Sequence, residues 1–152
     1  MTEPAGLSLL CRVRTQLCAL PLEYVLETMR PLPVEPLSGA PQFVQGLAII
    51  RGAPVPVVDA ARLLGAEATR PSRFVTLKAD ERRVALAVDS VLGVRSIPDG
   101  SLQALPPLLR DAGAEIVSKI GMLDAELLLV LRSVRFVTED LWAKLSADGA
   151  PS

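Results

Sequence analysis

The sequence predicts a mainly β protein, built as small barrels or a sandwich. Many short apolar segments of strand length follow one another, with turn-forming residues between them at spacings of about 8–12 residues. Only short stretches show helical spacing, and the regular strand–helix alternation of a doubly wound fold is absent from the sequence. The chain has 152 residues, which is enough for one domain or for two very small units that share a core.

The composition restricts the chemistry that the chain can perform. Half of the residues are hydrophobic but only 3% are aromatic, so aliphatic side chains must build the interior. A net charge of −1 argues against broad electrostatic binding to nucleic acid or to an anionic membrane. The sequence contains no histidine, which excludes Ser-His-Asp and Cys-His catalysis and the commonest transition-metal ligand. Glycine-rich phosphate-binding motifs are also missing, and we expect neither a cofactor nor a metal.

Two cysteines, Cys11 and Cys18, are too few for a disulfide framework or a zinc site. We expect reduced, buried thiols in neighbouring strands, with a bridge across the hairpin as the less favoured alternative. The first residues lack the basic and apolar regions of a signal peptide, and no apolar run approaches the roughly 20 residues of a membrane helix. The expectation is a soluble cytoplasmic protein.

The N-terminal part begins with two predicted strands, Leu7–Val13 and Gln16–Leu20, on either side of Arg14-Thr15. The next segment has two interpretations. Its apolar residues have helical spacing and fit one or two helical turns, or they form a bent strand through Val25–Met29. Prolines and a glycine between residues 31 and 41 then indicate a long surface connection.

The chain is organised around Gly46–Gly65, which reads as a strand, a tight turn at Arg51-Gly52, a second strand and a short helix. Glycine can adopt a positive φ, which suits a hairpin turn. Prolines 54 and 56 lack N–H groups on the same side of the second strand, so we expect that strand at a sheet edge or a barrel rim. Asp59 is placed to cap the helix that follows.

The remaining chain predicts more hairpins and a final helix. A loop is expected over Asp99–Glu115, which contains Pro106-Pro107, and a helix over Thr138–Leu145, with residues from Ala147 onwards frayed. The expected strands are Arg73–Lys78, Arg82–Asp89, Val91–Ile97, Ile116–Leu123 and Glu126–Leu131. A weak internal echo links residues 49–65 with residues 122–137, since each reads as strand, tight turn, apolar strand and a short tail. Two related half-barrels would explain that echo.

The central segment resembles the CheW family of chemotaxis coupling proteins, whose members carry a segment of the form R-G-x-x-x-P-V-V-D. Here that segment is Arg51–Asp59, within Gly46–Ala60. The similarity continues in order along nearly the whole chain. It includes the V-x-E segment at Val25–Glu27, the V-D-x-V segment at Val88–Val91 and the final hairpin within Ile116–Leu131. The chain departs from the family pattern at several positions, among them Ile49 for Asn, Pro54 for Val and Ala125 for Gly.

The resemblance implies a fold and a function. The fold would be two small five-stranded SH3-like barrels around a shared apolar core, with short helices including a C-terminal one. Residues 1–152 would form a single CheW-like domain with two intertwined subdomains, whose boundary lies near residues 66–72. The protein would be an adaptor without an active site. Its partners would be the cytoplasmic tip of a chemoreceptor and the regulatory domain of a CheA-type histidine kinase, which would recruit it to receptor arrays at the membrane without insertion into the bilayer.

The resemblance also names site residues. Arg51 would contact a partner, because a guanidinium on a turn can bind carboxylates or carbonyl groups bidentately. The alternatives are a solvated turn arginine or an ion pair with Asp59 or Glu27. A structural role is expected for Gly46, Pro56 and Asp59. The residues implied in partner binding are Arg51, Gly52, Val25, Glu27, Val88 and Val94, although a valine at each of these positions is more often part of the core.

Two other classes of function are disfavoured. A small-barrel module that binds nucleic acid, a peptide or another ligand is the main alternative, but nucleic-acid binding needs basic residues interleaved with aromatic ones. An enzyme with paired acids could use Glu115 and Asp124, yet nothing in the pattern brings these two residues together. Arg82-Arg83 is better explained as a solvated turn than as a nucleic-acid site.

Overall fold

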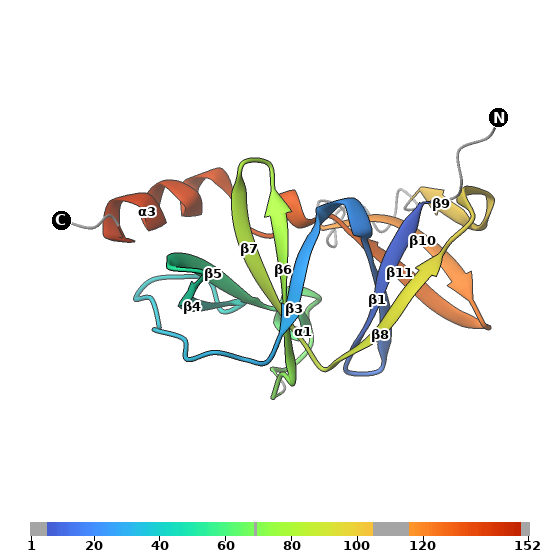
Figure 1. Ribbon diagram of the computed structural model, residues 1–152, viewed down its shortest axis with the longest axis horizontal. Helices are drawn as coiled ribbons and strands as arrows, with labels where there is room; N and C mark the ends of the chain where they lie inside the picture. Colours follow the sequence, from blue (N-terminus) through green and yellow to red (C-terminus); the bar gives the residue numbers. More distant parts are fainter. Residues whose placement is uncertain (1–5, 69, 105–115, 150–152) are drawn as a thin grey trace.

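The computed structural model describes residues 6–68, 70–104 and 116–149, and most of these residues lie in two β-sheets (Figure 1). The first sheet has six strands in the order β8 (Ser90–Ser96), β1 (Leu7–Val13), β2 (Gln16–Pro21), β11 (Glu126–Leu131), β10 (Val117–Leu123) and β9 (Leu102–Ala104). The second has five strands in the order β3 (Val25–Met29), β6 (Arg73–Ala79), β7 (Arg82–Val88), β5 (Ala53–Asp59) and β4 (Val44–Ile50). The predicted mainly β class is confirmed.

One sheet has a strand more than the five that were expected. The additional strand β9 pairs with Lys119–Gly121 of β10, inside the segment that was predicted to be a loop. A 3-10 turn at Asp99–Ser101 precedes it. The rest of that predicted loop, residues 105–115, lies outside the described residues. The segment after β2 follows the second of its two interpretations, since a 3-10 turn at Leu22–Tyr24 leads directly into strand β3.

The two sheets follow one plan. In each sheet, the second strands of two hairpins pair in parallel: β5 with β7, and β11 with β2. An edge strand then completes each sheet, β3 beside β6 and β8 beside β1. In chain order, β1–β5 and β6–β11 are therefore two repeats of the same strand plan, apart from β9. The sequence echo between residues 49–65 and 122–137 falls on the two hairpins that occupy equivalent places.

The repeats exchange strands, so that each contributes to both sheets. Residues 66–72 lie between the repeats, but the strands on either side of them, β5 and β6, belong to the same sheet. The chain passes from one sheet to the other between β2 and β3, and again between β7 and β8. Residues 66–72, where the resemblance implies a subdomain boundary, therefore connect two strands of the same sheet.

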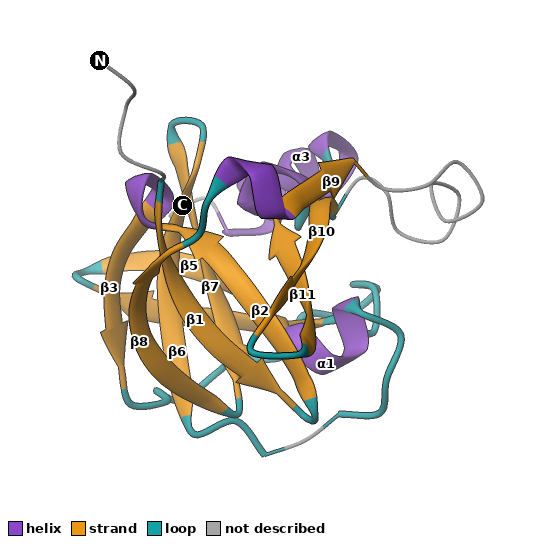
Figure 2. Cartoon of the chain, turned by 90° about the vertical axis from the view of Figure 1, so that its right-hand side faces the viewer, coloured by secondary structure: helices purple, strands orange, loops and turns teal. Residues whose placement is uncertain are grey.

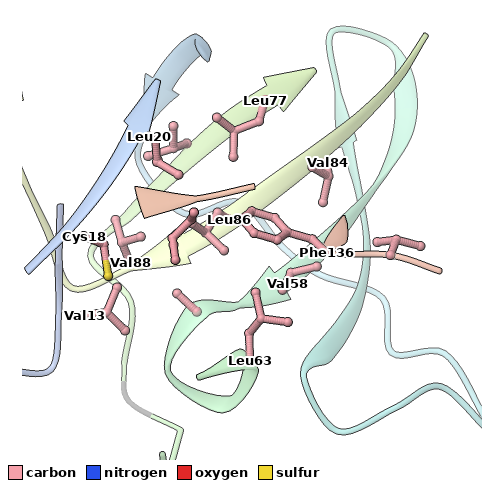
Figure 3. Close-up of a cluster of buried hydrophobic side chains, with 14 of the residues drawn as sticks. Val13, Cys18, Leu20, Val58, Leu63, Leu77, Val84, Leu86, Val88 and Phe136 are labelled. Carbon is pink, nitrogen blue, oxygen red and sulfur yellow. The ribbon is translucent and has the colours of Figure 1, made fainter. Parts of the chain in front are cut away.

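A shared apolar core joins the two sheets, as predicted. Its main cluster takes Cys18 and Leu20 from the six-stranded sheet and Leu77, Leu86 and Val88 from the five-stranded sheet (Figure 3). Two smaller clusters are each built mainly from one sheet. The main cluster contains residues of both sheets, as is typical of the core of one domain.

The C-terminal helix α3 (Glu139–Gly149) packs on the β6–β7 hairpin. Thr138 caps it as expected: the main-chain N–H of Leu141 donates to Thr138 Oγ1 at 3.2 Å. Trp142 is buried, and the Arg82 guanidinium lies 5.0 Å from its ring centre while also binding Glu139 at 3.2 Å. Arg82 is therefore exposed beside the β6–β7 turn, as expected, and also contacts the helix. The helix also continues to Gly149, past its expected end at residue 145.

Candidate partner-binding surface

The turn between β4 and β5 presents Arg51 to solvent. Arg51 has φ 54° and Gly52 has φ 79°, so both central residues of this two-residue turn are left-handed. That geometry matches the right-handed twist of a hairpin, and glycine adopts it without strain. The Arg51 side chain is 70% exposed. The predicted turn and the outward position of Arg51 and Gly52 are both present.

Arg51 forms a two-pronged ion pair with Glu27 on β3. Arg51 Nε donates to Glu27 Oε2 at 3.0 Å, and the NH2 group donates to Oε1 at 2.8 Å. Strands β3 and β4 are the two edges of the five-stranded sheet. An ion pair between β3 and the β4–β5 turn therefore shows that the sheet curls until its edges approach each other. The ion pair with Glu27 is one of the alternatives that the sequence allowed for Arg51, and it is present in the structure.

This ion pair shifts the pKa values of both groups. The hydrogen bonds from Arg51 lower the pKa of the Glu27 carboxyl, an effect that partial desolvation opposes and that the charges of Arg51 and Arg83 reinforce. The same contact raises the pKa of Arg51. Glu27 is therefore held as a carboxylate, and the pair stays charged across the physiological pH range.

A hollow of about 270 Å³ adjoins the ion pair. Leu26, Ile50 and Val55 give it an apolar lining, and Arg83 stands at its rim with Arg51. Thr76 lies on its wall and donates through Oγ1 to the main-chain oxygen of Glu27 at 3.3 Å. Leu26 and Arg83 were not among the predicted site residues. The sequence gives little indication that Leu26 and Arg83 belong to this site, because only the curl of the sheet brings them beside Arg51.

The three valines predicted for this surface occupy different environments. Val25 is half-buried on β3, two residues before Glu27, and packs against the main core. Val94 is 49% exposed on β8, the edge strand of the other sheet. Val88 is completely buried, so its prediction as a partner-binding residue is wrong. β7 is a central strand with apolar residues on both faces, and Val88 belongs to the core between the sheets.

Asp59 and Gly46 have the structural roles that were expected. Asp59 is 3% exposed, and its Oδ1 accepts hydrogen bonds from the main-chain N–H groups of Ala61 at 3.0 Å and Arg62 at 3.3 Å, which caps helix α1 (Ala60–Leu63). Gly46 has φ 146°, and a Cβ atom there would lie 1.9 Å from the main-chain oxygen of Glu35. No other residue type fits that position without movement of the backbone.

Pro56 lies in a strand that is not a sheet edge, so the first of the two expected places for this strand is wrong. β5 has β4 on one side and β7 on the other. However, the pairing with β7 covers only Val57–Asp59. Pro54 and Pro56 therefore sit in the half of the strand that has one neighbour, where a missing N–H removes no bond to β7.

Other polar residues singled out in the sequence have local roles. The Asp89 carboxylate accepts a hydrogen bond from the main-chain N–H of Arg14 at 2.9 Å and so fixes the β1–β2 turn. Asp124 binds Arg95 at 2.8 Å, and Glu115 lies outside the described residues.

Cys11 and Cys18 face each other across the β1–β2 hairpin as buried, free thiols, as expected. Burial raises the pKa of both thiols to about 12. Within the described residues, no group of three or more potential ligands is arranged to hold a metal ion. The part of the chain that the structure covers also contains no helix that is long and apolar enough to span a bilayer.

Comparison with known proteins shows the family and the fold of this chain. The sequence model of the CheW-like domain matches residues 8–140 of this chain. The crystal structure of the scaffolding protein TtCheW from Thermoanaerobacter tengcongensis superposes with a TM-score of 0.76 at 21% identity, covering 86% of this chain and 90% of that one. The fold is therefore the two-barrel, SH3-like fold of that protein.

The chain belongs to the CheW-like domain family. Among its relatives are the chemotaxis protein CheW of Rhizobium meliloti (strain 1021), 35% identical over 82 residues, and protein FrzA of Myxococcus xanthus, 37% identical over 98 residues. These matches cover 52% and 62% of this chain. The chain spans 53% and 61% of the lengths of these two relatives.

Proposed function

We propose that this protein is a non-enzymatic adaptor that couples chemoreceptors to a CheA-type histidine kinase in chemotaxis or a chemotaxis-like pathway. The observation that carries the proposal is the exposed Arg51–Glu27 pair, in a chain whose residues 8–140 match the CheW-like domain. Its partners are the regulatory domain of the kinase and the cytoplasmic tip of a receptor. It works in the cytoplasm, held at receptor arrays through these partners, with no nucleic-acid or direct membrane contact.

The chemistry of the surface suits an acidic partner group. An exposed ion pair contributes little to stability, so its members can exchange partners at small cost. A carboxylate of the partner can share the Arg51 guanidinium with Glu27, while Arg83 supplies a second positive charge at the same hollow. Leu26 and Ile50 line the hollow and accept an apolar side chain of the partner. Gly52 lets the partner backbone approach the turn closely.

Two valines on edge strands of the two sheets are further proposed contacts with the partners. Val25 lies on the same strand as Glu27, and Val94 is exposed on the edge strand β8. Apolar contacts of this kind supply affinity, while the charges fix orientation and association rate. The two sets together describe a small interface, as expected for partners that assemble and dissociate.

A calorimetric titration tests the proposal. The protein is titrated with the regulatory domain of a CheA-type kinase and, separately, with a receptor fragment that contains the cytoplasmic tip. We expect saturable one-to-one binding to both, and a loss of at least about tenfold in affinity for one of them in Arg51→Glu. Arg73→Glu is the matched control, since Arg73 is an exposed arginine of the same sheet whose guanidinium binds the main-chain oxygen of Ser72.

Two results would contradict the proposal. Absence of binding to both partners would show that only the fold is shared with the family. Equal losses in Arg51→Glu and Arg73→Glu would show a general charge effect and would remove Arg51 from the interface.

A further inference from the structure

A second surface, separate from Arg51, lies between helix α1 and the β10–β11 hairpin. It is a groove of about 630 Å³, within the range of about 300–1,000 Å³ that ligand-binding pockets occupy. We call it the α1–hairpin groove. Figure 2 shows α1 beside that hairpin. None of its lining residues takes part in the hollow beside Glu27 and Arg51.

The groove is lined mainly by aliphatic side chains. Leu63 and Leu64 come from α1 and its C-terminal end, and Ile120, Leu127 and Leu129 come from the hairpin. Ile120 is paired with Leu129, and Leu127 is paired with Met122, so these side chains share one face of the hairpin. Leu127 is 52% exposed and Met122 is 64% exposed. This face therefore leaves a strip of apolar surface in water, which is typical of an interaction site.

At the middle of the groove, the strands beneath it already have neighbours on both sides. β11 pairs with β10 and, over Leu128–Val130, with β2; β10 pairs with β11 and, over Lys119–Gly121, with β9. Along these residues the backbone hydrogen-bonding groups are directed toward existing neighbours, whereas strand addition needs a free sheet edge. An occupant must bind through its side chains and satisfy its own backbone, which an α-helix does.

The charges at the rim indicate the sign of the occupant. Arg14 and Arg62 both line the groove and are exposed. Arg14 NH1 donates to the main-chain oxygen of Glu67 and Arg62 NH1 donates to Gln42 Oε1, each at 3.0 Å, so both contacts are with neutral oxygen atoms. None of the ion pairs between described residues involves either arginine. The exposed side chain of Glu67 offsets one of these two positive charges.

We infer that the α1–hairpin groove binds an amphipathic helix of a partner protein, with an aliphatic stripe seated against Leu127 and Leu129 and acidic residues beside the stripe that meet Arg14 and Arg62. This inference goes beyond the proposed function and does not depend on the Arg51 surface. It gives the protein a docking site that selects helices by charge as well as by shape.

A designed peptide tests the inference. The probe is a helical peptide of about 18 residues with leucines at i, i+3, i+4 and i+7 and glutamates beside them, and its charge control carries glutamines in place of the glutamates. Each is titrated into the isotope-labelled full chain and followed through amide NMR shifts. We expect shifts in α1 and the β10–β11 hairpin, and at least about tenfold tighter binding of the glutamate peptide in low salt.

Four variants locate the site. Leu127→Glu should weaken the glutamate peptide at least about tenfold, while Leu92→Glu, at a leucine of matched 51% exposure on β8, should not. The double variant Arg14→Gln/Arg62→Gln should remove the preference for glutamate over glutamine. Arg51→Glu should leave peptide binding unchanged, so this test can fail or succeed independently of the adaptor proposal. Amide spectra of each variant confirm that it is folded.

The inference is overturned if neither peptide binds, if Leu127→Glu and Leu92→Glu bind alike, or if the double variant still prefers glutamate. It is also overturned if Arg51→Glu abolishes peptide binding, because the two surfaces would then be one.

Discussion

Glu27 and Arg51 show how single residues set the response of the surface to pH. The hydrogen bonds from Arg51 lower the pKa of Glu27 in the folded protein. A lowered pKa means that the folded state favours the carboxylate, so its stabilising effect is complete above the pKa that Glu27 has in the unfolded chain. That effect is lost as the pH falls through the lower pKa of the folded state.

An NMR titration of the Glu27 carboxyl carbon checks this expectation. The midpoint should lie below the ordinary value for glutamate, and Arg51→Gln should move it upward toward that value. Arg73→Gln should leave the midpoint where it is. A midpoint that does not respond to Arg51→Gln would show that the ion pair does not persist in solution.

Gly46 is the residue whose replacement should be most damaging on local grounds. It combines a φ of 146° with a Cβ position 1.9 Å from the Glu35 oxygen, so Gly46→Ala must displace the backbone. We expect a loss of at least about 3 kcal/mol in the free energy of unfolding. Gly52→Ala is the control, since its φ of 79° is also left-handed but no atom lies within 4 Å of its Cβ position. Denaturant unfolding compares the two, and equal losses would contradict the steric argument.

At the scale of the element, the β10–β11 turn can be made more stable by a single substitution. Asp124 and Ala125 have φ values of 51° and 65°, which match the geometry of the Arg51-Gly52 turn but without a glycine. A left-handed conformation costs an L-residue about 1–2 kcal/mol, while glycine adds about 0.5–1 kcal/mol of unfolded-state entropy. Ala125→Gly should therefore stabilise the protein by about 0.5–1 kcal/mol.

Thermal unfolding measures this gain as a higher Tm. Ala104→Gly in β9 serves as the control, because a glycine in an ordinary strand weakens it. If both variants had lower Tm values than the unaltered protein, the relief of strain at Ala125 would be smaller than the entropy that glycine adds to the unfolded chain.

The hairpins were predictable because their signals are local. Arg51-Gly52 and the alternation of apolar residues around it specify a turn and two strands within a few positions, and Asp59 marks the helix that follows. The segment before residue 30 was ambiguous, since residues with helical spacing also suit a half-buried strand. Pairing with β6 decides for the strand. Val88 was misassigned because both faces of β7 are apolar, so alternation does not reveal which face meets the core.

At the scale of the whole molecule, the exchange of strands between the repeats was not visible in the sequence. β3 pairs with β6, and β8 pairs with β1, so each edge strand is far in sequence from its partner. No local propensity encodes such pairings. The ion pair between Glu27 and Arg51 depends on the same long-range pairing of β3 with β6. From the sequence, Glu27 was therefore only one of several possible partners for Arg51.

The shared core predicts cooperative unfolding of both sheets. Leu131 is in the six-stranded sheet, whereas Trp142, the only tryptophan, is on α3 beside the five-stranded sheet, and both belong to the main cluster. Leu131→Ala should cost about 2–5 kcal/mol and shift the Trp142 fluorescence transition together with the circular dichroism transition. The exposed Leu127→Ala should shift neither by much. Separate transitions for the two probes would mean that the sheets unfold independently.

The central claim is that one copy of this chain holds a kinase and a receptor at the same time. Analytical ultracentrifugation of the chain with a kinase regulatory domain and a receptor-tip fragment tests this most directly. We predict a species with the mass of all three components, which is lost in Arg51→Glu and kept in Arg73→Glu. If only pairwise complexes form, so that the receptor fragment displaces the kinase domain, the account of the protein as a coupling adaptor is wrong.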